Sequence, residues 1–184
     1  YATSSIFLWL LLGVLASGRG SNLQAIIDNI EKGLLSAELA VVISDQAGAF
    51  ALERARKHGI PAVHADSRGF RGKREEYDAL LAKELQKRSV DVVCLAGFMR
   101  IITPVLIKAF PDRILNIHPS LLPKYRGAAP INWAIIRGET KTGVTIMRMD
   151  EGMDSGDILL QQETLIDTDE NFGRLHDRLA VQGA

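Results

Sequence analysis

The feature that most constrains the fold of this chain is an alternation of short apolar runs with segments of helical period. The run Val90–Ala96 is almost continuously apolar, which is typical of a strand buried on both faces of a parallel sheet. The preceding segment, Lys73–Lys87, is highly charged, but it has one apolar helical side formed by Tyr77, Leu80, Leu81 and Leu85. Repeated units of this kind predict a mainly parallel sheet with helices on both faces, a Rossmann-like α/β fold.

The same periodicities place the other elements along the chain. Further strands are expected at 10–16, 39–43, 61–64, 114–118, 143–149 and 157–162, and further helices at about 47–57, at 131–137 and from 171 onward. Ser21 or Asn22 is expected to cap a helix after the first strand, because side-chain oxygens of these types accept the free N–H groups of a first turn. Thr103 and Pro104 predict the start of a short helix for a similar reason.

Length and composition limit the possible classes of protein. At 184 residues and 47% apolar composition, the chain can bury the core of one domain. We therefore expect one domain over residues 1–184, with residues 1–9 extraneous and the final helix truncated. Lys plus Arg and Asp plus Glu each number 22, which argues against a basic surface built for nucleic acid. The single cysteine, Cys94, is expected to be buried, and a cytoplasmic location is predicted.

Residues 6–16 form an apolar run of the length found in the core of a signal peptide. No Lys or Arg precedes this run, and it is too short to span a bilayer as a helix. It leads directly into a glycine-rich loop. We therefore interpret its later half as a buried strand rather than as a targeting segment, and we expect no membrane partner.

Asn116 and His118 are the first candidate catalytic residues. They stand two positions apart in an expected strand, so both side chains lie on one face of the sheet. Such a pair suits a carbonyl attacked by an amine, because the amide can hydrogen-bond the developing oxyanion and the imidazole can carry the proton. Asp154, in a later glycine-flanked turn, could orient this imidazole or hold it protonated. For any one of these residues, a polar strand end capped by a turn is the structural alternative.

The string "NIHPSLLP" at 116–123, together with Asp154, resembles the catalytic motif of the folate-dependent formyltransferases. That family passes a formyl group from 10-formyltetrahydrofolate to a primary amine. The resemblance implies that Asn116, His118 and Asp154 form the catalytic set, with 10-formyltetrahydrofolate as formyl donor.

The resemblance changes character along the chain. Segments 14–27 ("VLASGRGSNLQAII") and 91–125 resemble the glycinamide ribonucleotide formyltransferases of purine synthesis. From Arg126 on, "RGAAPINWAIIRGETKTGVTIMRMDEGMDSGDILL" resembles the catalytic domain of methionyl-tRNA formyltransferases. The chain therefore has the character of a mosaic with its seam near Tyr125 and Arg126.

The loop Gly18–Asn22 lies between the first expected strand and helix, where free N–H groups and the helix dipole can receive a phosphate. A plain tight turn is the alternative. The resemblance to the purine enzyme implies that Gly20, Ser21 and Asn22 bind the substrate phosphate. A dinucleotide oxidoreductase is rejected because the stretch around Ala25 offers no third glycine.

The resemblance also implies a folate site at the carboxyl end of the central strand, where open parallel sheets bind ligands. Its residues would be Arg74, Phe98, Met99, Arg100, Ile101, Ile102, Leu115, Asp150, Glu151 and Gly152. The apolar members would pack on the pterin, and Arg74 and Arg100 would meet the glutamyl carboxylates. Core packing and surface charge pairs are the structural alternatives. No spacing of His, Cys and carboxylates indicates a metal site.

The leading hypothesis for the acceptor is glycinamide ribonucleotide, because the loop Gly18–Asn22 matches that branch and no second domain is apparent. Methionyl-tRNA is the alternative suggested by the segment from Arg126, as a catalytic domain or a chimera, and tRNA is a partner only in that case. An aminosugar nucleotide is a third possible acceptor. In an ungapped match from Asp154, a glutamate that contacts the acceptor in the purine enzyme falls at Gly183. An inactive folate-binding protein is the alternative from another functional class.

Overall fold

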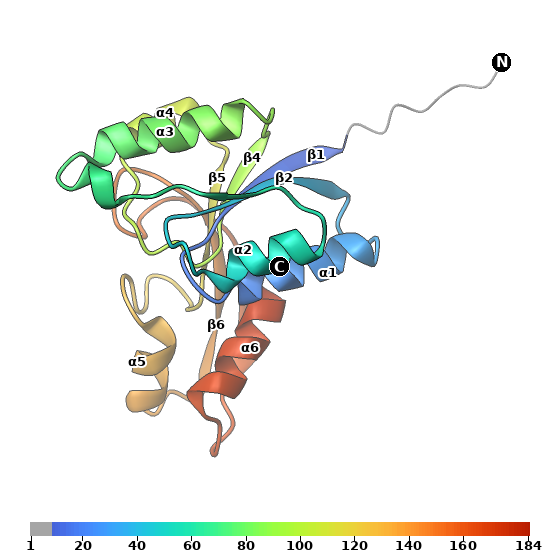
Figure 1. Ribbon diagram of the computed structural model, residues 1–184. Coiled ribbons are helices and arrows are strands. Elements are labelled where there is room, and N and C mark those ends of the chain that lie inside the picture. The colour runs from blue at the N-terminus through green and yellow to red at the C-terminus, as the bar shows by residue number, and fades with distance from the viewer. Residues whose placement is uncertain (1–8) are drawn as a thin grey trace.

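The computed structural model describes residues 9–184, so the predicted extraneous segment lies outside the described residues except for Trp9. A seven-stranded sheet in the order β3-β2-β1-β4-β5-β6-β7 forms the centre of the protein (Figure 1). Its strands are β1 (Leu10–Leu15), β2 (Ala37–Ser44), β3 (Ala62–His64), β4 (Val92–Leu95), β5 (Ile114–His118), β6 (Lys141–Arg148) and β7 (Ile158–Leu165).

The first five strands pair in parallel, and β6 and β7 pair antiparallel with their neighbours. This arrangement confirms the predicted mainly parallel α/β fold. Helical crossovers join the parallel strands, whereas only the loop 149–157 joins β6 to β7. A parallel pair needs a crossover of a dozen or more residues, so this short loop returns the chain antiparallel.

The helices lie on both faces of the sheet. They are α1 (Ser21–Glu31), α2 (Phe50–Lys57), α3 (Arg74–Gln86), α4 (Pro104–Ala109), α5 (Pro130–Ile136) and α6 (Phe172–Gln182), with a 3-10 turn at Arg68–Phe70. α1, α2 and α6 cover one face, and α3 and α4 cover the other (Figure 1). Val14 and Leu15 are both completely buried, one against each layer of helices, which explains why the central strands are apolar without alternation.

Two predicted helix caps differ in detail from the structure. α1 begins after Gly20, and neither Ser21 nor Asn22 caps it. Gly20 has a φ of +69°, and a Cβ there would lie 2.8 Å from the Cα of Ala51, so the close approach of α2 excludes a capping side chain. Thr103 does stand at the N-cap of α4, but its hydroxyl donates to Asp78 Oδ2 at 2.8 Å.

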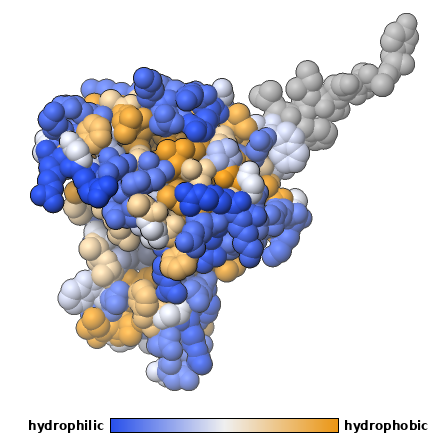
Figure 2. All heavy atoms as spheres, in the orientation of Figure 1, coloured by the Kyte–Doolittle hydropathy of each residue, from blue (hydrophilic) through white to orange (hydrophobic). Residues whose placement is uncertain are grey.

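The surface seen in Figure 2 is largely hydrophilic, and apolar side chains gather at its lower end around α5. Ile136 and Trp133 of α5 are 70% and 47% exposed. Within residues 9–184, no helix combines the length and the apolar character needed to cross a membrane.

Candidate active site

The carboxyl ends of three parallel strands meet at one edge of the sheet. Leu95 at the end of β4 pairs with Asn116 of β5. After β1, the N–H of Ser17 donates to the carbonyl of Gly97 at 3.0 Å, and Ser17 Oγ accepts from the N–H of Met99 at 2.9 Å. The loops after β1, β4 and β5 therefore lie together, at the kind of edge where open α/β sheets bind ligands.

Asn116 and His118 project from the same face of β5, as the two-residue spacing predicts. Asn116 is half-buried, whereas the side chain of His118 is only 6% exposed. The Nε2 of His118 lies 2.9 Å from the carbonyl oxygen of Tyr125. Because a carbonyl only accepts, this contact assigns a proton to Nε2 and leaves Nδ1 as the nitrogen able to gain or lose one.

Asp154 faces that nitrogen from a distant turn. Its Oδ2 lies 3.6 Å from His118 Nδ1 and accepts a hydrogen bond of 2.7 Å from the N–H of Gly127. The Asp154 side chain is 12% exposed, so water screens this pair less than it would a surface pair. The structure therefore brings Asp154 to His118, on the face of β5 that Asn116 shares.

The turn after β5 is held by buried hydroxyls. Ser120 Oγ donates to the carbonyl of Lys124 at 2.6 Å, and Thr145 Oγ1 donates to the carbonyl of Ser120 at 2.6 Å. Beyond this turn, Tyr125 and Ala129 both adopt φ near +56°. Non-glycine residues in that region are uncommon and cost energy, so the surrounding contacts impose the conformation that aims the Tyr125 carbonyl at His118.

The glycine loop leads directly into the first turn of α1. Gly20 turns in the left-handed region and α1 starts at Ser21, with no acidic residue in its first turn. The first three N–H groups of a helix have no partner within it, and here the first internal bond runs from Gln24 to Gly20. Ser21 and Asn22 are half-buried, and they lie beside these N–H groups.

The predicted folate stretch after β4 divides into exposed and buried parts. Met99 and Ile101 are 82% and 57% exposed, whereas Ile102 is buried and Phe98 is partly buried against the core. Met99 and Ile101 can thus meet a ligand, and Ile102 acts as core. A folate-binding role for Met99 and Ile101 stays a prediction, and the burial of Ile102 favours core packing for that residue.

Arg100 and Arg74 stand near one buried carboxylate. The Arg100 guanidinium lies over the ring of Tyr77, 4.7 Å from its centroid. Both arginines act electrostatically on Asp78, but burial has the larger effect and raises the pKa of the Asp78 carboxyl. Asp78 itself accepts a hydrogen bond from the Thr103 hydroxyl at 2.8 Å.

Of the remaining predicted folate residues, three lie in the loop that ends at Asp154, whereas Leu115 lies on the other face of β5 from Asn116 and His118. Asp150 Oδ1 accepts from the N–H of Gly152 and from Ser155 Oγ, each at 2.9 Å, which shapes the loop that ends at Asp154. Glu151 is exposed on that loop. Leu115 lies on the opposite face of β5 from Asn116 and His118, because successive strand residues alternate. The structure therefore does not bring its side chain to theirs.

Two features at α6 cannot be found from the sequence. The Nε2 of His176 lies 3.3 Å from Ser21 Oγ, across 155 positions of sequence. Gly183 is packed against the sheet, where a Cβ would lie 2.6 Å from Ile117, so the position that the resemblance gives to an acceptor-binding glutamate points into the core. No periodicity signals either contact, because both depend on how α6 docks.

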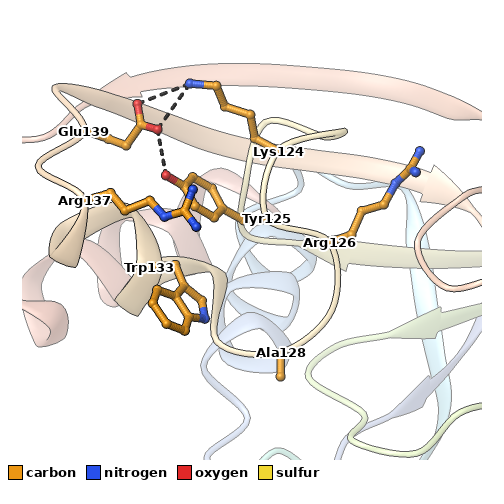
Figure 3. A pocket seen from close by; sticks show the side chains of 7 residues that line it. All are labelled: Lys124, Tyr125, Arg126, Ala128, Trp133, Arg137 and Glu139. Atoms are coloured by element: carbon orange, nitrogen blue, oxygen red, sulfur yellow. Dashed lines mark hydrogen bonds and ion pairs between the residues drawn. The ribbon is translucent and has the colours of Figure 1, made fainter.

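A cavity of about 420 Å³ adjoins the turn that holds His118 (Figure 3). Its lining residues are Lys124, Tyr125, Arg126, Ala128, Trp133, Arg137 and Glu139. Tyr125 donates its hydroxyl hydrogen to Glu139 Oε1 at 2.7 Å, and this bond raises the pKa of Tyr125. The Arg137 guanidinium lies 5.6 and 5.9 Å from the ring centroids of Tyr125 and Trp133. Within the described range 9–184, no three His, Cys, Asp or Glu residues cluster closely enough to hold a metal ion.

Known proteins resemble this chain along most of its length. It is 42% identical over 173 residues to the trifunctional purine biosynthetic protein adenosine-3 of Chironomus tentans, covering 92% of this chain and 12% of that protein. It is 56% identical over 107 residues to the methionyl-tRNA formyltransferase of Syntrophus aciditrophicus (strain SB), covering 58% of this chain and 34% of that one. The chain thus spans about a third or less of these two relatives.

Solved structures agree with this likeness. Glycinamide ribonucleotide transformylase 1 from Symbiobacterium toebii matches with a TM-score of 0.89 and 42% identity, covering 95% of this chain and 82% of that one. Phosphoribosylglycinamide formyltransferase from Bacillus halodurans matches with a TM-score of 0.85 and 38% identity, covering 92% and 87%. The family model described as formyl transferase matches residues 12–184. This chain therefore belongs to the formyl transferase family.

Proposed function

We propose that this protein transfers a formyl group from 10-formyltetrahydrofolate to the primary amine of glycinamide ribonucleotide. The observation that carries the proposal is the convergence of Asn116, His118 and Asp154 at the carboxyl edge of the sheet. The chain that carries these residues matches a glycinamide ribonucleotide transformylase over 95% of its length. Family membership supports formyl transfer, and this match favours the purine precursor as acceptor.

In this proposal His118 accepts and then donates the transferred proton, and Asp154 stabilises the protonated ring. When the acceptor amine adds to the formyl carbon, its nitrogen becomes acidic, and His118 Nδ1 is the ring nitrogen able to take that proton. Asp154, 3.6 Å away, stabilises the imidazolium that results. The proton then passes to the nitrogen that leaves as tetrahydrofolate departs, so His118 acts first as base and then as acid.

Asn116 supplies the second element of catalysis. Its side chain shares a face of β5 with His118 and is half-buried, so its amide N–H groups can donate to the oxygen that gains charge when the amine adds. The protonated His118 adds positive charge to the same region. A fixed donor on a strand needs no reorganisation during the reaction, which is why such groups contribute strongly to rate.

We propose that residues at this edge bind the donor substrate. Met99 and Ile101 offer exposed apolar surface for a planar pterin. Arg74 and Arg100, which both act electrostatically on Asp78, would bind the acidic tail of a folate. For the acceptor, we propose that the first turn of α1 at Gly20, Ser21 and Asn22 binds the phosphate.

The acceptor is tested by incubating the protein with 10-formyltetrahydrofolate and, separately, glycinamide ribonucleotide, charged methionyl-tRNA and an aminosugar nucleotide. We expect formylation of glycinamide ribonucleotide, followed by product mass and by release of tetrahydrofolate. A folate analogue titrated in parallel distinguishes an inactive binder, which would saturate without turnover. Absence of product with this acceptor would refute the proposal.

The catalytic assignment is tested with His118→Ala and Asp154→Asn. Each should lower kcat by about 10²- to 10⁴-fold, the range of general acid–base and oxyanion groups, while the thermal midpoint stays near that of the wild type. Asp157→Asn is a matched control, because Asp157 is an exposed carboxylate just beyond the same turn. Near-normal turnover in either site variant would contradict the assigned roles.

Methionyl-tRNA is the second candidate acceptor, favoured by the 56% identity to a methionyl-tRNA formyltransferase. The cavity beside the catalytic turn carries Lys124, Arg126 and Arg137 against one carboxylate, Glu139. Such an excess of positive charge suits a polyanionic acceptor. If tRNA is the substrate, charged methionyl-tRNA will be formylated in the assay above and Arg137→Ala will raise its KM.

A further inference from the structure

His118 belongs to a row of three residues that crosses β5, β6 and β7. In the antiparallel part of the sheet, His118 stands opposite Thr145, and Thr145 stands opposite Gln161. Residues directly opposite one another in antiparallel strands project from the same face of the sheet. The imidazole of His118, a hydroxyl and a side-chain amide therefore lie in one line across three strands.

The amide of Gln161 contacts the turn that follows β5. Its Nε2 donates to the carbonyl of Leu122 at 2.8 Å and to Thr145 Oγ1 at 2.9 Å. An amide nitrogen carries two hydrogens, so these contacts use both of them. Gln161 is exposed as a whole, but Leu122 and Thr145 are buried. The two hydrogen bonds therefore end on atoms of buried residues, where a lost partner is costly.

Thr145 connects Gln161 to the rest of the turn. Its Oγ1 donates to the carbonyl of Ser120 at 2.6 Å and accepts from the N–H of Leu122 at 3.1 Å. With the hydrogen bond from Gln161, this hydroxyl donates once and accepts twice, which is its full capacity. A buried network in which every member is satisfied favours one arrangement of the backbone.

The far end of the turn holds the ring of His118. Ser120 Oγ donates to the carbonyl of Lys124 at 2.6 Å, and the next carbonyl, that of Tyr125, lies 2.9 Å from His118 Nε2. With Nε2 directed to this carbonyl, Nδ1 lies 3.6 Å from Asp154 Oδ2. A displaced turn would move the Tyr125 carbonyl and allow the ring to adopt its other tautomer.

We propose that Gln161 is a positioning residue for His118. By holding the turn after β5, it keeps the Tyr125 carbonyl at Nε2 and leaves Nδ1 free to exchange a proton. This inference rests on the proposed function and deepens it, because Gln161 acts through the turn and not on either substrate. Its loss therefore appears in kcat more than in KM.

The kinetic test uses two substitutions at this position. Gln161→Leu removes both donors, and Gln161→Glu keeps the shape but only accepts hydrogen bonds when ionised. Each should lower kcat by about 10- to 100-fold, the range for a misplaced catalytic group, with KM for glycinamide ribonucleotide within about two-fold. The kcat is referred to sites counted by titration with a folate analogue, so that a loss of folded protein alone leaves it unchanged. An unchanged kcat in either variant would overturn the inference.

Gln162→Leu is the matched control. Gln162 is the next residue of β7 and is also exposed, but its side chain projects from the opposite face of the strand. This variant should keep the kcat of the wild type. An equal loss of kcat in Gln162→Leu would overturn the inference, because it would indicate that any change in β7 disturbs the site.

A second measurement separates this inference from the proposed function. The protein is labelled with ¹⁵N-histidine, and the ring signals of His118 are assigned by their loss in His118→Ala. At about pH 9, above the range in which an imidazole ordinarily titrates, these signals report which ring nitrogen carries the proton. We expect the proton on Nε2 in the wild type and in Gln162→Leu, and a mixture of both tautomers in Gln161→Leu.

Two outcomes of this measurement would refute the inference. One is a wild-type His118 ring with its proton on Nδ1, and the other is an unchanged tautomer in Gln161→Leu. If the wild type formylates none of the acceptors, the proposed function fails, and the ring signals of His118 alone decide whether Gln161 positions the ring.

Discussion

Cys94, the single cysteine of the chain, lies in β4 and is half-buried rather than fully buried as expected, packed against the core under α1, α2 and α6. Its partial burial raises the pKa of the thiol to about 11. Since the thiolate is the reactive form, we expect Cys94 in the native protein to react with a disulfide reagent at pH 8 far more slowly than in urea-unfolded protein. Rapid labelling of the native protein would contradict the burial.

The same shift predicts a dependence of stability on pH. The thiol stays protonated in the folded state up to a pKa of about 11, whereas it ionises near its ordinary value of 9.0 when unfolded. Ionisation of the unfolded state therefore removes stability as pH rises from 9 to 11. Cys94→Ala should lose less free energy of unfolding over this interval than the wild type, as measured by urea titrations at both pH values.

At Gly20, backbone conformation and packing both restrict substitution. Its φ is +69°, and an added Cβ would lie 2.8 Å from the Cα of Ala51 and 2.9 Å from its Cβ. We expect Gly20→Ala to lower the free energy of unfolding by about 1–3 kcal/mol, since strain and overpacking add. Gly33→Ala, which has a similar φ but open space, is the control and should cost about 1 kcal/mol.

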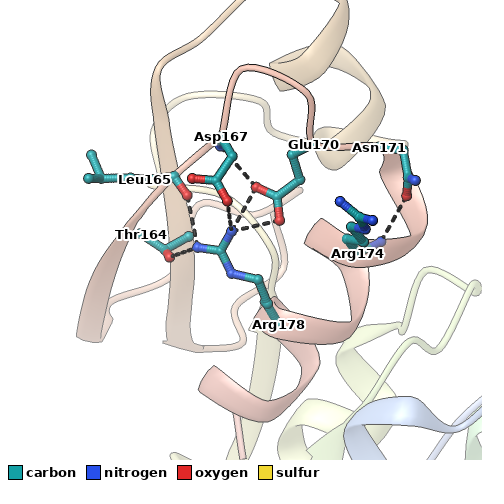
Figure 4. A network of polar contacts seen from close by, with 7 residues as sticks. All are labelled: Thr164, Leu165, Asp167, Glu170, Asn171, Arg174 and Arg178. Carbon is teal, nitrogen blue, oxygen red and sulfur yellow. Dashed lines mark hydrogen bonds and ion pairs between the residues drawn. The ribbon is translucent and has the colours of Figure 1, made fainter.

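At the element scale, α6 is attached by a network around Arg178 (Figure 4). Arg178 Nη1 lies 2.6 and 2.7 Å from the two carboxylate oxygens of Glu170, and its Nη2 donates to Thr164 Oγ1 and to the carbonyl of Leu165. The Glu170 side chain is only 2% exposed. This arginine thus joins α6 to the end of β7 and to the turn between them.

Arg178→Met should leave the buried Glu170 carboxylate without its charged partner. We expect the free energy of unfolding to fall by about 2 kcal/mol, below the full cost of breaking a buried pair because Arg178 is itself 41% exposed. Thermal or urea unfolding measures the change. Arg174→Met is the control on the same helix. Arg174 is exposed, and only its main-chain N–H contacts Asn171, so the substitution keeps that contact. An equal loss of unfolding free energy in Arg174→Met would show that the network contributes little.

At the scale of the whole molecule, the sheet has a hydrophobic core on each of its two faces. Leu81 of α3 and Leu175 of α6 are both completely buried, on opposite faces. If residues 9–184 unfold as one domain, Leu81→Ala and Leu175→Ala should each lower the same single transition by about 2–5 kcal/mol. Leu34→Ala, at a site 75% exposed, should change little.

This prediction is checked by following urea unfolding with two probes. Far-UV circular dichroism reports the whole chain, and fluorescence reports Trp9 and Trp133, at the start of β1 and within α5. Coincident curves in all variants would support the single domain expected from the sequence. Separate transitions for the two leucine variants would instead indicate two units that unfold independently.

Much of this architecture follows from local pattern. Val14 and Leu15 are an example, because they pack on opposite faces of β1. In a central parallel strand both faces are covered, so a run of consecutive apolar residues predicts both the strand and its central place in the sheet. The spacing of Asn116 and His118 likewise places two side chains on one face without any knowledge of the rest of the fold. The predicted Ser21 or Asn22 cap was wrong because the position is decided by the approach of α2 to Gly20, which no local pattern reports.

By itself, then, the sequence determined the mainly parallel α/β fold and the fact that Asn116 and His118 share one face of β5. Both follow from patterns that repeat every two to four residues. Only the tertiary structure decided that Asp154 stands 3.6 Å from His118, that the Tyr125 carbonyl holds the other ring nitrogen, and that His176 reaches Ser21. These contacts join segments separated by as many as 155 positions. Their geometry depends on how whole elements pack, because a side chain has no preference for a distant partner until packing brings the two together.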